Sequence, residues 1–529
     1  TAPISLATLT TNGKDFKLAN GTTDLTLANN FTLSSGKLST QGGDLVFAGN
    51  ANISDNASLD ATVTTGTAGK LEFKQGGVAS GTINAEKATF KLGADYVVDG
   101  TLITGSGTTW QLGTSDLDLS GGELLLGGNV VLDNVITDNQ TRFQLAEDAT
   151  VTRNAGFTLG GLKFDDNTFT LGSATTDLTL VDNSTSSSGS NTGSPPGTLA
   201  TKLADFTFIS ADAVDITTGT TITSTGGKFS FAKGIKMNGA AISLTDTTLA
   251  VGDNLTKTGG TLTLNQADLE LTSDLTLSSD ADLVFDTFVP NAKNLVLGDN
   301  STAKVSLGNL NLPSSSIDVK GGTLNITGGS VGANGSLEIG GSGTLILGGN
   351  LGVTGTLNLN DGATTTFAGN KIDVSGGTLM LAGTHSLNSI TTNDQTKLKI
   401  NNSASVSRTD SGTSTVGSLT YSQSGSSGSL SLSVSNMGLT LASATPVSGA
   451  SLNQNNGVLT FQSAPSLSNS SSLSVSNGEL VLQNGATVNG SSVQLSGSVF
   501  KPTGTVSVTN GGTFTLNQSS STVLQGDTT

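Results

Sequence analysis

The chain has no cysteine in its 529 residues, and only 8 prolines, 2 tyrosines, 1 tryptophan and 1 histidine. The lack of cysteine excludes disulfide bonds and thiolate metal sites. Stability must therefore come from main-chain hydrogen bonds and a continuous apolar interior. Bacterial proteins that cross a periplasm and fold outside the cell often avoid cysteine, so an extracellular or cell-surface location is expected.

Positive charge and long apolar runs are also scarce. The chain has 23 Lys and Arg against 40 Asp and Glu, a formal net charge of −17 and a pI near 4.3. Binding along a nucleic acid needs a basic stripe, so we expect no nucleic-acid partner. No apolar run reaches the roughly 18 residues of a membrane-spanning helix, and we expect no transmembrane segment.

The composition is poor in the residues that build amphipathic helices. Only 34% of the residues are hydrophobic and 12% charged, whereas Gly alone contributes 70. These values argue against long helices. They are also compatible with disorder, but the apolar residues are spaced regularly, which favours a folded chain.

A short alternating pattern recurs from end to end, in which a polar residue usually separates two apolar ones. Examples are Phe16-Lys17-Leu18, Leu25-Thr26-Leu27, Leu45-Val46-Phe47, Leu71-Glu72-Phe73, Phe90-Lys91-Leu92, Leu178-Thr179-Leu180, Leu275-Thr276-Leu277, Leu357-Asn358-Leu359 and Phe514-Thr515-Leu516. Alternation with period two, punctuated by Gly, Asn, Asp or Ser, predicts short strands with one buried face.

The pattern repeats about every 20 residues. One ladder runs through Leu71, Phe90, Trp110, Val130, Val151 and Leu171, and another through Leu379, Leu398, Leu419, Leu439, Leu459 and Leu480. A unit of about 20 residues is too small to fold alone, but stacked copies bury one another's inward side chains. We therefore predict an all-β parallel β-helix, or β-solenoid, with three short strands per coil. Antiparallel sandwiches, the alternative, normally have longer strands.

A second marker is a Gly-Gly pair, one small or acidic residue and then an apolar residue. It occurs at Gly42-Gly43-Asp44-Leu45, Gly121-Gly122-Glu123-Leu124, Gly259-Gly260-Thr261-Leu262, Gly321-Gly322-Thr323-Leu324, Gly376-Gly377-Thr378-Leu379 and Gly511-Gly512-Thr513-Phe514. Most intervals between copies are near multiples of about 20 residues, which predicts a repeated corner of the coil.

Three segments follow from these patterns. Residues 1–182 are predicted to form a first part of the solenoid, and 183–197 a flexible Ser/Gly/Pro-rich loop or linker. Residues 198–529 are predicted to form a second part, whose charge nearly disappears beyond Asn401. A neutral polar surface there permits close packing against another solenoid or a carbohydrate, although a simply solvated outer face is the favoured explanation.

Candidate catalytic or metal-binding residues are few. Asp165-Asp166 and the pair Asp280 and Asp282 are the nearest carboxylates, and His385 lies in a predicted turn. Acidic residues at solenoid turns usually accept hydrogen bonds from their own backbone, and an isolated turn histidine is usually solvated. We expect no catalytic residue, no metal site and no cofactor.

The aromatic and threonine patterns also favour structural roles. Trp110 occupies a rung of the first ladder, which predicts packing, and Tyr96 and Tyr421 form no array of stacking platforms. The Thr-x-Thr triplets at 221–223 and 513–515 suggest an ice-binding face. That function needs triplets repeated coil after coil on one face, and we expect no such repetition.

The motif Gly-Gly-Thr-Leu-x-Leu, at 259–264 and, as Gly-Gly-Thr-Leu-Met-Leu, at 376–381, resembles the strand repeats of bacterial autotransporter passengers and filamentous-haemagglutinin-like adhesins. The resemblance covers most of the chain. It implies secretion, a β-helical stalk and an adhesive or surface-layer role. The chain differs from these families in having no carboxy-terminal membrane barrel or recognisable secretion domain, and no family active-site residue can be transferred.

The segments near the two ends of the sequence, Ile4–Leu9 and Val523-Leu524, do not have the pattern of a capping helix. Exposed strand edges normally need a cap. Either the natural chain continues, or the last coil of one copy meets the first coil of another. We expect an extracellular structural or adhesive protein that self-associates into a filament or coat. The alternatives are an adhesin module that binds cell-surface glycans and, less favoured, a carbohydrate-active enzyme.

Overall fold

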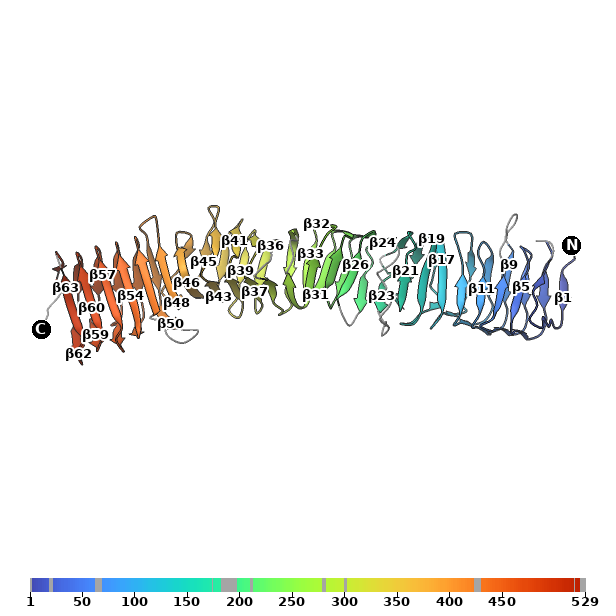
Figure 1. Ribbon diagram of the computed structural model, residues 1–529, viewed down its shortest axis with the longest axis horizontal. Coiled ribbons are helices and arrows are strands. Elements are labelled where there is room, and N and C mark those ends of the chain that lie inside the picture. The colour runs from blue at the N-terminus through green and yellow to red at the C-terminus, as the bar shows by residue number, and fades with distance from the viewer. Residues whose placement is uncertain are drawn as a thin grey trace. The chain divides into compact units, whose positions relative to one another are not determined.

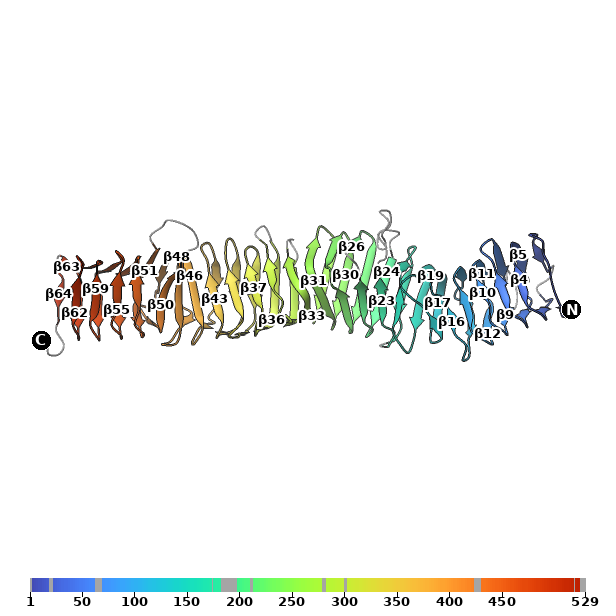
Figure 2. The same ribbon diagram turned by 90° about the horizontal axis from the view of Figure 1, so that it is seen from below.

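The computed structural model describes residues 2–18, 22–61, 69–173, 175–181, 197–209, 213–277, 282–298, 302–422, 430–517 and 519–523 (Figures 1 and 2). All regular elements in these ranges are β-strands, and every strand pairing described is parallel. The coils have about 20 residues, as in the step from Leu25 to Leu45. The predicted all-β parallel β-solenoid is confirmed.

The chain divides into two compact units, Thr1–Asp268 and Leu269–Thr529. The predicted loop or linker at 183–197 lies outside the described residues except for Gly197, which begins β24 (Gly197–Lys202). β22 (Thr168–Leu171) pairs directly with β24, so the strands before and after this segment belong to one ladder of the first unit.

The first coils of unit 1 each contribute a strand to three parallel sheets. The first sheet contains β1 (Ile4–Leu6), β3 (Leu25–Leu27), β6 (Leu45–Phe47), β9 (Lys70–Phe73), β12 (Thr89–Leu92) and β15 (Thr109–Gln111). The second contains β4 (Phe31–Leu33), β7 (Ala51–Ile53), β10 (Val78–Ala79), β13 (Tyr96–Val98), β16 (Leu117–Asp118) and β18 (Val135–Ile136). The third begins with β2 (Phe16–Lys17), β5 (Gly36–Ser39), β8 (Ala57–Asp60), β11 (Thr82–Asn84) and β14 (Thr101–Ile103).

The later coils of unit 1 continue the stack. The third sheet extends through β17 (Glu123–Val131), β19 (Arg142–Thr152), β22, β24, β27 (Thr220–Thr225), β30 (Ala241–Thr245) and β32 (Thr261–Asn265), with β21 (Gly161–Lys163) on β19. The other strands here are β20 (Phe157–Leu159), β23 (Leu178–Val181), β25 (Phe206–Ile209), β26 (Val214–Thr217), β28 (Lys228–Phe231), β29 (Ile235–Asn238) and β31 (Thr248–Lys257).

Unit 2 has the same construction. One series of paired strands contains β33 (Asp268–Leu277), β35 (Leu295–Leu297), β37 (Ser316–Val319), β40 (Ser336–Ile339), β43 (Thr356–Leu359), β46 (Thr378–Ser386), β48 (Lys397–Ser407) and β50 (Ser418–Ser422). Beside it lie β34 (Asp282–Val289), β36 (Lys304–Leu312), β38 (Thr323–Ile326), β41 (Thr344–Leu347) and β44 (Thr364–Thr366), and then β39 (Gly329–Val331), β42 (Leu351–Val353), β45 (Ile372–Asp373) and β47 (Ile390–Thr391).

The last coils of unit 2 form three further ladders. β48 continues into β51 (Leu430–Ser435), β54 (Ala450–Asn455), β57 (Ser472–Ser476), β60 (Ser492–Ser496) and β63 (Thr513–Asn517). The second ladder contains β49 (Thr413–Val416), β52 (Gly438–Leu441), β55 (Val458–Phe461), β58 (Glu479–Leu482), β61 (Val499–Pro502) and β64 (Ser521–Thr522). The third contains β53 (Pro446–Ser448), β56 (Ser466–Ser468), β59 (Ala486–Asn489) and β62 (Val506–Thr509).

Inward side chains of successive coils lie on one another and form the core. Phe47 and Phe73 are fully buried, with ring centroids 5.1 Å apart in a stacked arrangement. Phe73 also packs against Phe90 at 5.9 Å and against Tyr96 at 4.2 Å. Such contacts add to the burial of apolar surface, so the aromatic residues of unit 1 hold consecutive coils together.

The two predicted ladders are correct except at one step each. Leu71, Phe90 and Trp110 pair in register, as do Val130, Val151 and Leu171, but no pairing joins β15 to the strand containing Val130. In unit 2, Leu439 is paired with Ser414 and not with Leu419, which lies on another strand ladder. Residues about 20 apart lie on one another only where the coil between them has about 20 residues. A longer or shorter coil places the later residue on another face.

Each unit contains a version of the same group of coils. Residues 89–153 align with 344–408 without a gap, with identities that include Gly121 and Gly376, Gly122 and Gly377, Gly128 and Gly383, Thr141 and Thr396, and Arg153 and Arg408. The register shifts in both, between Leu126 and Gly128 in β17 and between Leu381 and Gly383 in β46. The chain therefore contains an internal duplication.

The duplicated corner is held by one acceptor side chain. Asp138 Oδ1 accepts hydrogen bonds from the main-chain N–H of Gly121, Gln140 and Thr141. In unit 2, Asn393 Oδ1 accepts the corresponding bonds from Gly376, Gln395 and Thr396. Both corners thus keep their main-chain donors satisfied, which a turn between buried strands requires.

Candidate functional site

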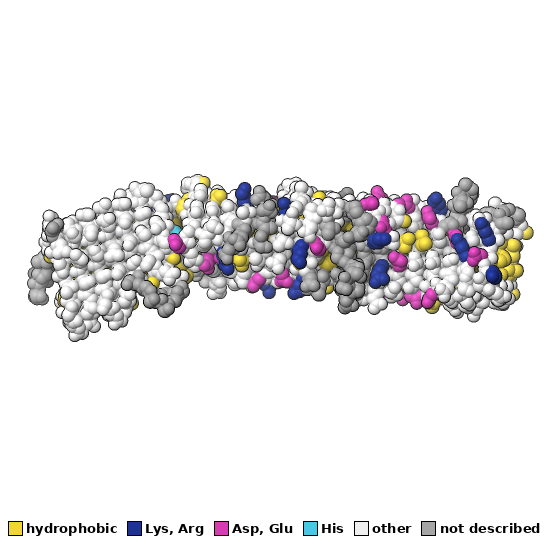
Figure 3. All heavy atoms as spheres, viewed as in Figure 1, with side chains coloured by type: hydrophobic (Ala, Val, Ile, Leu, Met, Phe, Trp, Pro, Cys, Tyr) yellow, Lys and Arg dark blue, Asp and Glu magenta, His cyan; other side chains and the backbone are white. Residues whose placement is uncertain are grey.

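The outer side of β51, β54, β57, β60 and β63 is the most regular surface of unit 2. The residues between the buried positions of these strands form columns of Ser, Thr, Asn and Gln: Ser431, Ser451, Ser472, Ser492 and Thr513; Ser433, Asn453, Ser474, Gln494 and Thr515; and Ser435, Asn455, Ser476, Ser496 and Asn517. In Figure 3 the coils that Figure 1 colours red show almost no charged side chain. We call this surface the hydroxyl face.

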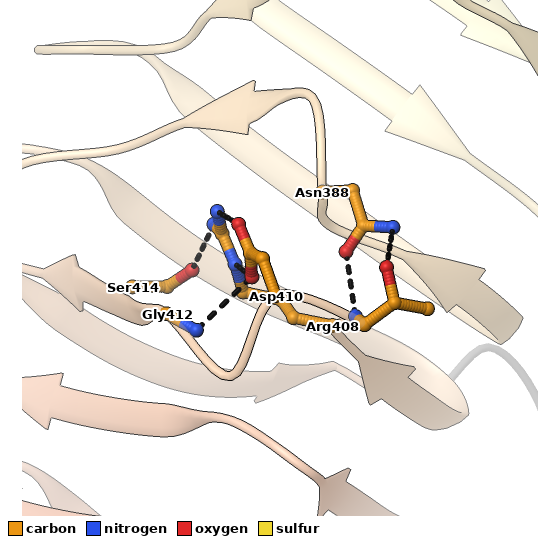
Figure 4. Close-up of polar contacts among 6 residues, drawn as sticks. Asn388, Arg408, Asp410, Gly412 and Ser414 are labelled. Carbon is orange, nitrogen blue, oxygen red and sulfur yellow. Dashed lines mark hydrogen bonds and ion pairs between the residues drawn. The ribbon is translucent and has the colours of Figure 1, made fainter.

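The charged side chains that the structure describes in these coils, and just before them, are paired. Lys501 Nζ lies 2.8 Å from Glu479 Oε2. Arg408 forms a bidentate pair with Asp410, at 2.8 Å from Nε and 2.7 Å from Nη2, and Gly412 N–H donates to the same carboxylate (Figure 4). The hydrogen bonds from Arg408 and from Gly412 hold the pKa of Asp410 well below its ordinary value. Because the opposite charges are paired, the electrostatic field around this region is weak.

The threonine triplet at 221–223 does not repeat coil after coil on its face of unit 1, as expected. Thr221, Thr223 and Thr225 of β27 pair with Ala241, Ser243 and Thr245 of β30, which pair with Thr261, Thr263 and Asn265 of β32. The middle coil has Ala241 and Ser243 opposite Thr221 and Thr223, so no regular array of threonine triplets forms there.

His385 is buried in a strand and does not lie in a solvated turn as predicted. It belongs to β46 at a position that pairs with Val406, is 7% exposed, and has Nε2 2.6 Å from the carbonyl oxygen of Ala382. In the duplicated copy, Val130 holds this position. The histidine therefore fills an inward site that an apolar residue fills elsewhere.

The predicted carboxylate pair Asp165-Asp166 lies in a turn that follows β21. Asp165 Oδ1 lies 3.2 Å from Lys163 Nζ, and its Oδ2 accepts a 2.6 Å hydrogen bond from Gln144 Nε2. Asp165 and Asp166 both have positive φ, at 49° and 66°, as tight turns require. Asp280 and the side chain of Asp282 lie outside the described residues.

The aromatic candidates have the packing roles that were predicted for Trp110. Its ring lies 5.8 Å from that of Phe90 in an edge-on contact, while its Nε1 is buried without an acceptor. Tyr96 is fully buried and donates a 2.9 Å hydrogen bond to the carbonyl oxygen of Ala51, and burial raises its pKa. Tyr421 donates to Ser451 at 3.4 Å, and burial also raises its pKa.

A polar cleft of about 310 Å³ lies over β2, β5 and β8 of unit 1. Two carboxylates, Asp15 and Asp60, and two ammonium groups, Lys17 and Lys37, line it. Ser39, Gln41 and the half-buried Phe16 complete the lining. Sequence reasoning did not find this cleft, because its residues come from three coils and become neighbours only through the register Lys17 to Ser39 and Ser39 to Asp60.

In the last described coil, side chains at positions that face the core in other coils are exposed. Leu516 pairs with the buried Leu495 but is itself 46% exposed, and Val508 pairs with the buried Val488 but is 43% exposed. At the other end, Ile4 in β1 is 37% exposed. No further strand pairs with β62, β63 or β1 on their outer edges among the described residues, so main-chain donors and acceptors are presented there.

Within the described ranges, no cluster of three or more His, Asp or Glu side chains is placed to share a metal ion. The same residues contain no helix long and apolar enough to span a membrane. No model of a known protein family matches the chain, and no curated protein matches it.

Proposed function

We propose that this protein is an extracellular or cell-surface structural or adhesive β-solenoid that associates with copies of itself, end coil to end coil, into a filament or surface coat. The proposal includes no catalytic step. It is supported above all by the edge of the last described coil, where Val508 and Leu516 expose apolar surface beside unpaired main-chain groups.

Parallel stacking makes the two ends complementary. Strands in successive coils run in the same direction, so the outer edge of β62 and β63 pairs naturally with a coil of the same polarity, such as the first coil of another copy. Such a contact joins different surfaces of the two copies. Repetition of a contact of this type generates an open filament unless the rotation happens to close a ring.

The test compares two double variants on the same strands. Lysine at the exposed apolar positions, Val508→Lys with Leu516→Lys, should abolish association because it adds charge to the proposed contact. The control, Ser507→Lys with Thr515→Lys, adds the same charge at neighbouring outward positions. Light scattering and negative-stain microscopy should show assemblies for the wild type and the control only. A wild type that stays monomeric at high concentration, or equal behaviour of the two variants, contradicts the proposal.

The hydroxyl face favours a second candidate, adhesion to a neutral glycan. Its side chains donate and accept hydrogen bonds without charge, as the hydroxyl groups of a neutral polysaccharide do. Interfaces between proteins are normally poor in Ser, so a second copy fits this face less well.

Binding to insoluble neutral polysaccharide tests this second candidate. The wild type should be retained on the polysaccharide, and the double variant Ser474→Lys with Gln494→Lys should not. The control, Thr440→Lys with Thr460→Lys on the adjacent ladder, should be retained. Equal retention of both variants, or no retention of the wild type, counts against it.

A further inference from the structure

The polar cleft over β2, β5 and β8 has the size of a small-ligand site. Its volume of about 310 Å³ falls at the lower end of the roughly 300–1,000 Å³ range of ligand pockets. One sugar residue is a ligand of suitable size. The cleft lies on a parallel ladder in which Phe16 pairs with the buried Leu38, and Leu38 with the buried Leu59.

Most charges in the cleft already have partners. Lys37 forms an ion pair with Asp60, and the main-chain N–H of Lys37 donates a 2.9 Å hydrogen bond to Asp15 Oδ1. Lys17, in contrast, is exposed and has no ion-pair partner in the described part of the chain. It is therefore the cation available to a ligand, and a carboxylate is one of the anionic groups with which an ammonium forms strong hydrogen bonds.

The remaining lining groups suit a carbohydrate. Ser39, which is 8% exposed, and Gln41 are both in the lining. The Ser39 hydroxyl group and the Gln41 amide can donate hydrogen bonds to sugar hydroxyl groups and accept them, and the second oxygen of Asp15 can accept them. Phe16 is half-buried and supplies apolar surface for the C–H face of a sugar ring.

We infer that this cleft binds a sugar residue that carries a carboxylate, such as a hexuronic acid unit of an acidic glycan, with Lys17 as the counter-ion. The site lies on the first coils, where β2 is the end strand of its ladder, and all of its residues come from one copy of the chain. An adhesive solenoid with this cleft could bind acidic sugars in addition to the neutral glycans that suit the hydroxyl face.

Saturation-transfer NMR with the full chain tests the inference, using glucuronate as the probe and glucose and glucosamine as comparisons. Glucuronate should bind, glucose should bind more weakly than glucuronate, and glucosamine should not be preferred over glucuronate. Lys17→Gln should weaken glucuronate binding at least tenfold, while Lys17→Arg retains it. Lys14→Gln, which removes the same charge three residues away and outside the cleft, should leave binding unchanged.

Three results would overturn the site: no transfer to glucuronate, a preference for glucosamine, or unchanged binding in Lys17→Gln. The Val508→Lys with Leu516→Lys variant should still bind glucuronate. Failure of the acidic-sugar site and failure of end-to-end association are thus separated by the two sets of variants.

Discussion

Glycine pairs show how single residues set the geometry of each coil. Gly121 has φ of 80°, a conformation that side chains disfavour, and a Cβ on Gly122 would lie 2.2 Å from the carbonyl oxygen of Val98 in the preceding coil. Gly376 and Gly377 repeat both features in the duplicated copy, with φ of 81° and a 2.4 Å approach to Val353. The first glycine makes the corner, and the second allows the next coil to approach.

Glu72 is the residue whose charge is most closely tied to folding in unit 1. It is 7% exposed although it points outward, and it pairs with Lys70 and Lys91, both at 2.9 Å. Burial acts to raise its pKa, but the hydrogen bonds and charges of Lys91 and Lys70 outweigh burial, and the pKa is lowered from 4.5. A carboxyl group with a lowered pKa in the folded state stabilises the fold above its unfolded pKa.

We therefore expect the contribution of Glu72 to be complete above about pH 4.5 and to be lost as the pH falls below that value. Glu72→Gln should lower the melting temperature at pH 7 and have a smaller effect near pH 3. Melting curves followed by circular dichroism at both values measure this. Glu86→Gln on an exposed turn serves as the control, and a Glu72→Gln effect that is equal at both values would show that charge is not the cause.

At the scale of the strand, Asp and Asn side chains join each coil to the next. Asp177 Oδ1 accepts the main-chain N–H of Asp205 at 3.0 Å, and Asp205 Oδ1 accepts that of Lys228 at 2.8 Å, one coil further on. The same arrangement links Asp24 to Asp44 and Asp44 to Lys70. It recurs from Asn30 to Asn50, Asp95 to Asp116, Asp133 to Asn154, Asp148 to Thr168, Asp274 to Asn294, Asn294 to Ser316, Asn350 to Lys371 and Asn388 to Thr409.

Asp205→Ala should leave the N–H of Lys228 without its acceptor and cost roughly 1 kcal/mol. Asp205→Asn keeps an acceptor oxygen and should cost less. Hydrogen exchange resolved at the Lys228 amide, together with the melting temperature, tests the effect. Unchanged protection of this amide in Asp205→Ala would show that the side-chain bond does not support the coil.

The strands and their stacking were predictable, because alternation and a period near 20 express directly which side chains face inward. The face that each residue occupies was less predictable. Trp110 and Val130 differ by one period yet belong to strands that do not pair, and His385 appeared to be a turn residue because its neighbour Gly383 marks a bulge within β46. The acidic-sugar cleft escaped prediction since only the register of β2, β5 and β8 brings Lys17 and Asp60 together.

At the scale of the whole molecule, charge is distributed unevenly along the sequence. The net charge is −17, but the residues beyond Asn401 include only Arg408, Asp410, Glu479, Lys501 and Asp527 as charged side chains. Copies of the chain consequently repel one another mainly through the residues that precede this region. Repulsion between exposed charges is screened by salt, with a Debye length of about 10 Å at 0.1 M.

Self-association should therefore strengthen when sodium chloride is raised from about 0.01 M to about 0.1 M, which shortens the Debye length from about 30 Å to about 10 Å. Light scattering at constant protein concentration measures the change. Association that weakens over this range would indicate that opposite charges hold the copies together, contrary to an apolar contact at Val508 and Leu516.

The duplication bears on how this protein changes over evolutionary time. Residues 89–153 and 344–408 keep the same spacing and the same corner, so a chain in which one segment replaces the other should keep its strands in register. An unequal crossover between them would delete or add every intervening coil in one event and still leave a correctly phased junction. The number of coils in such a solenoid can therefore change by a whole block without a new fold.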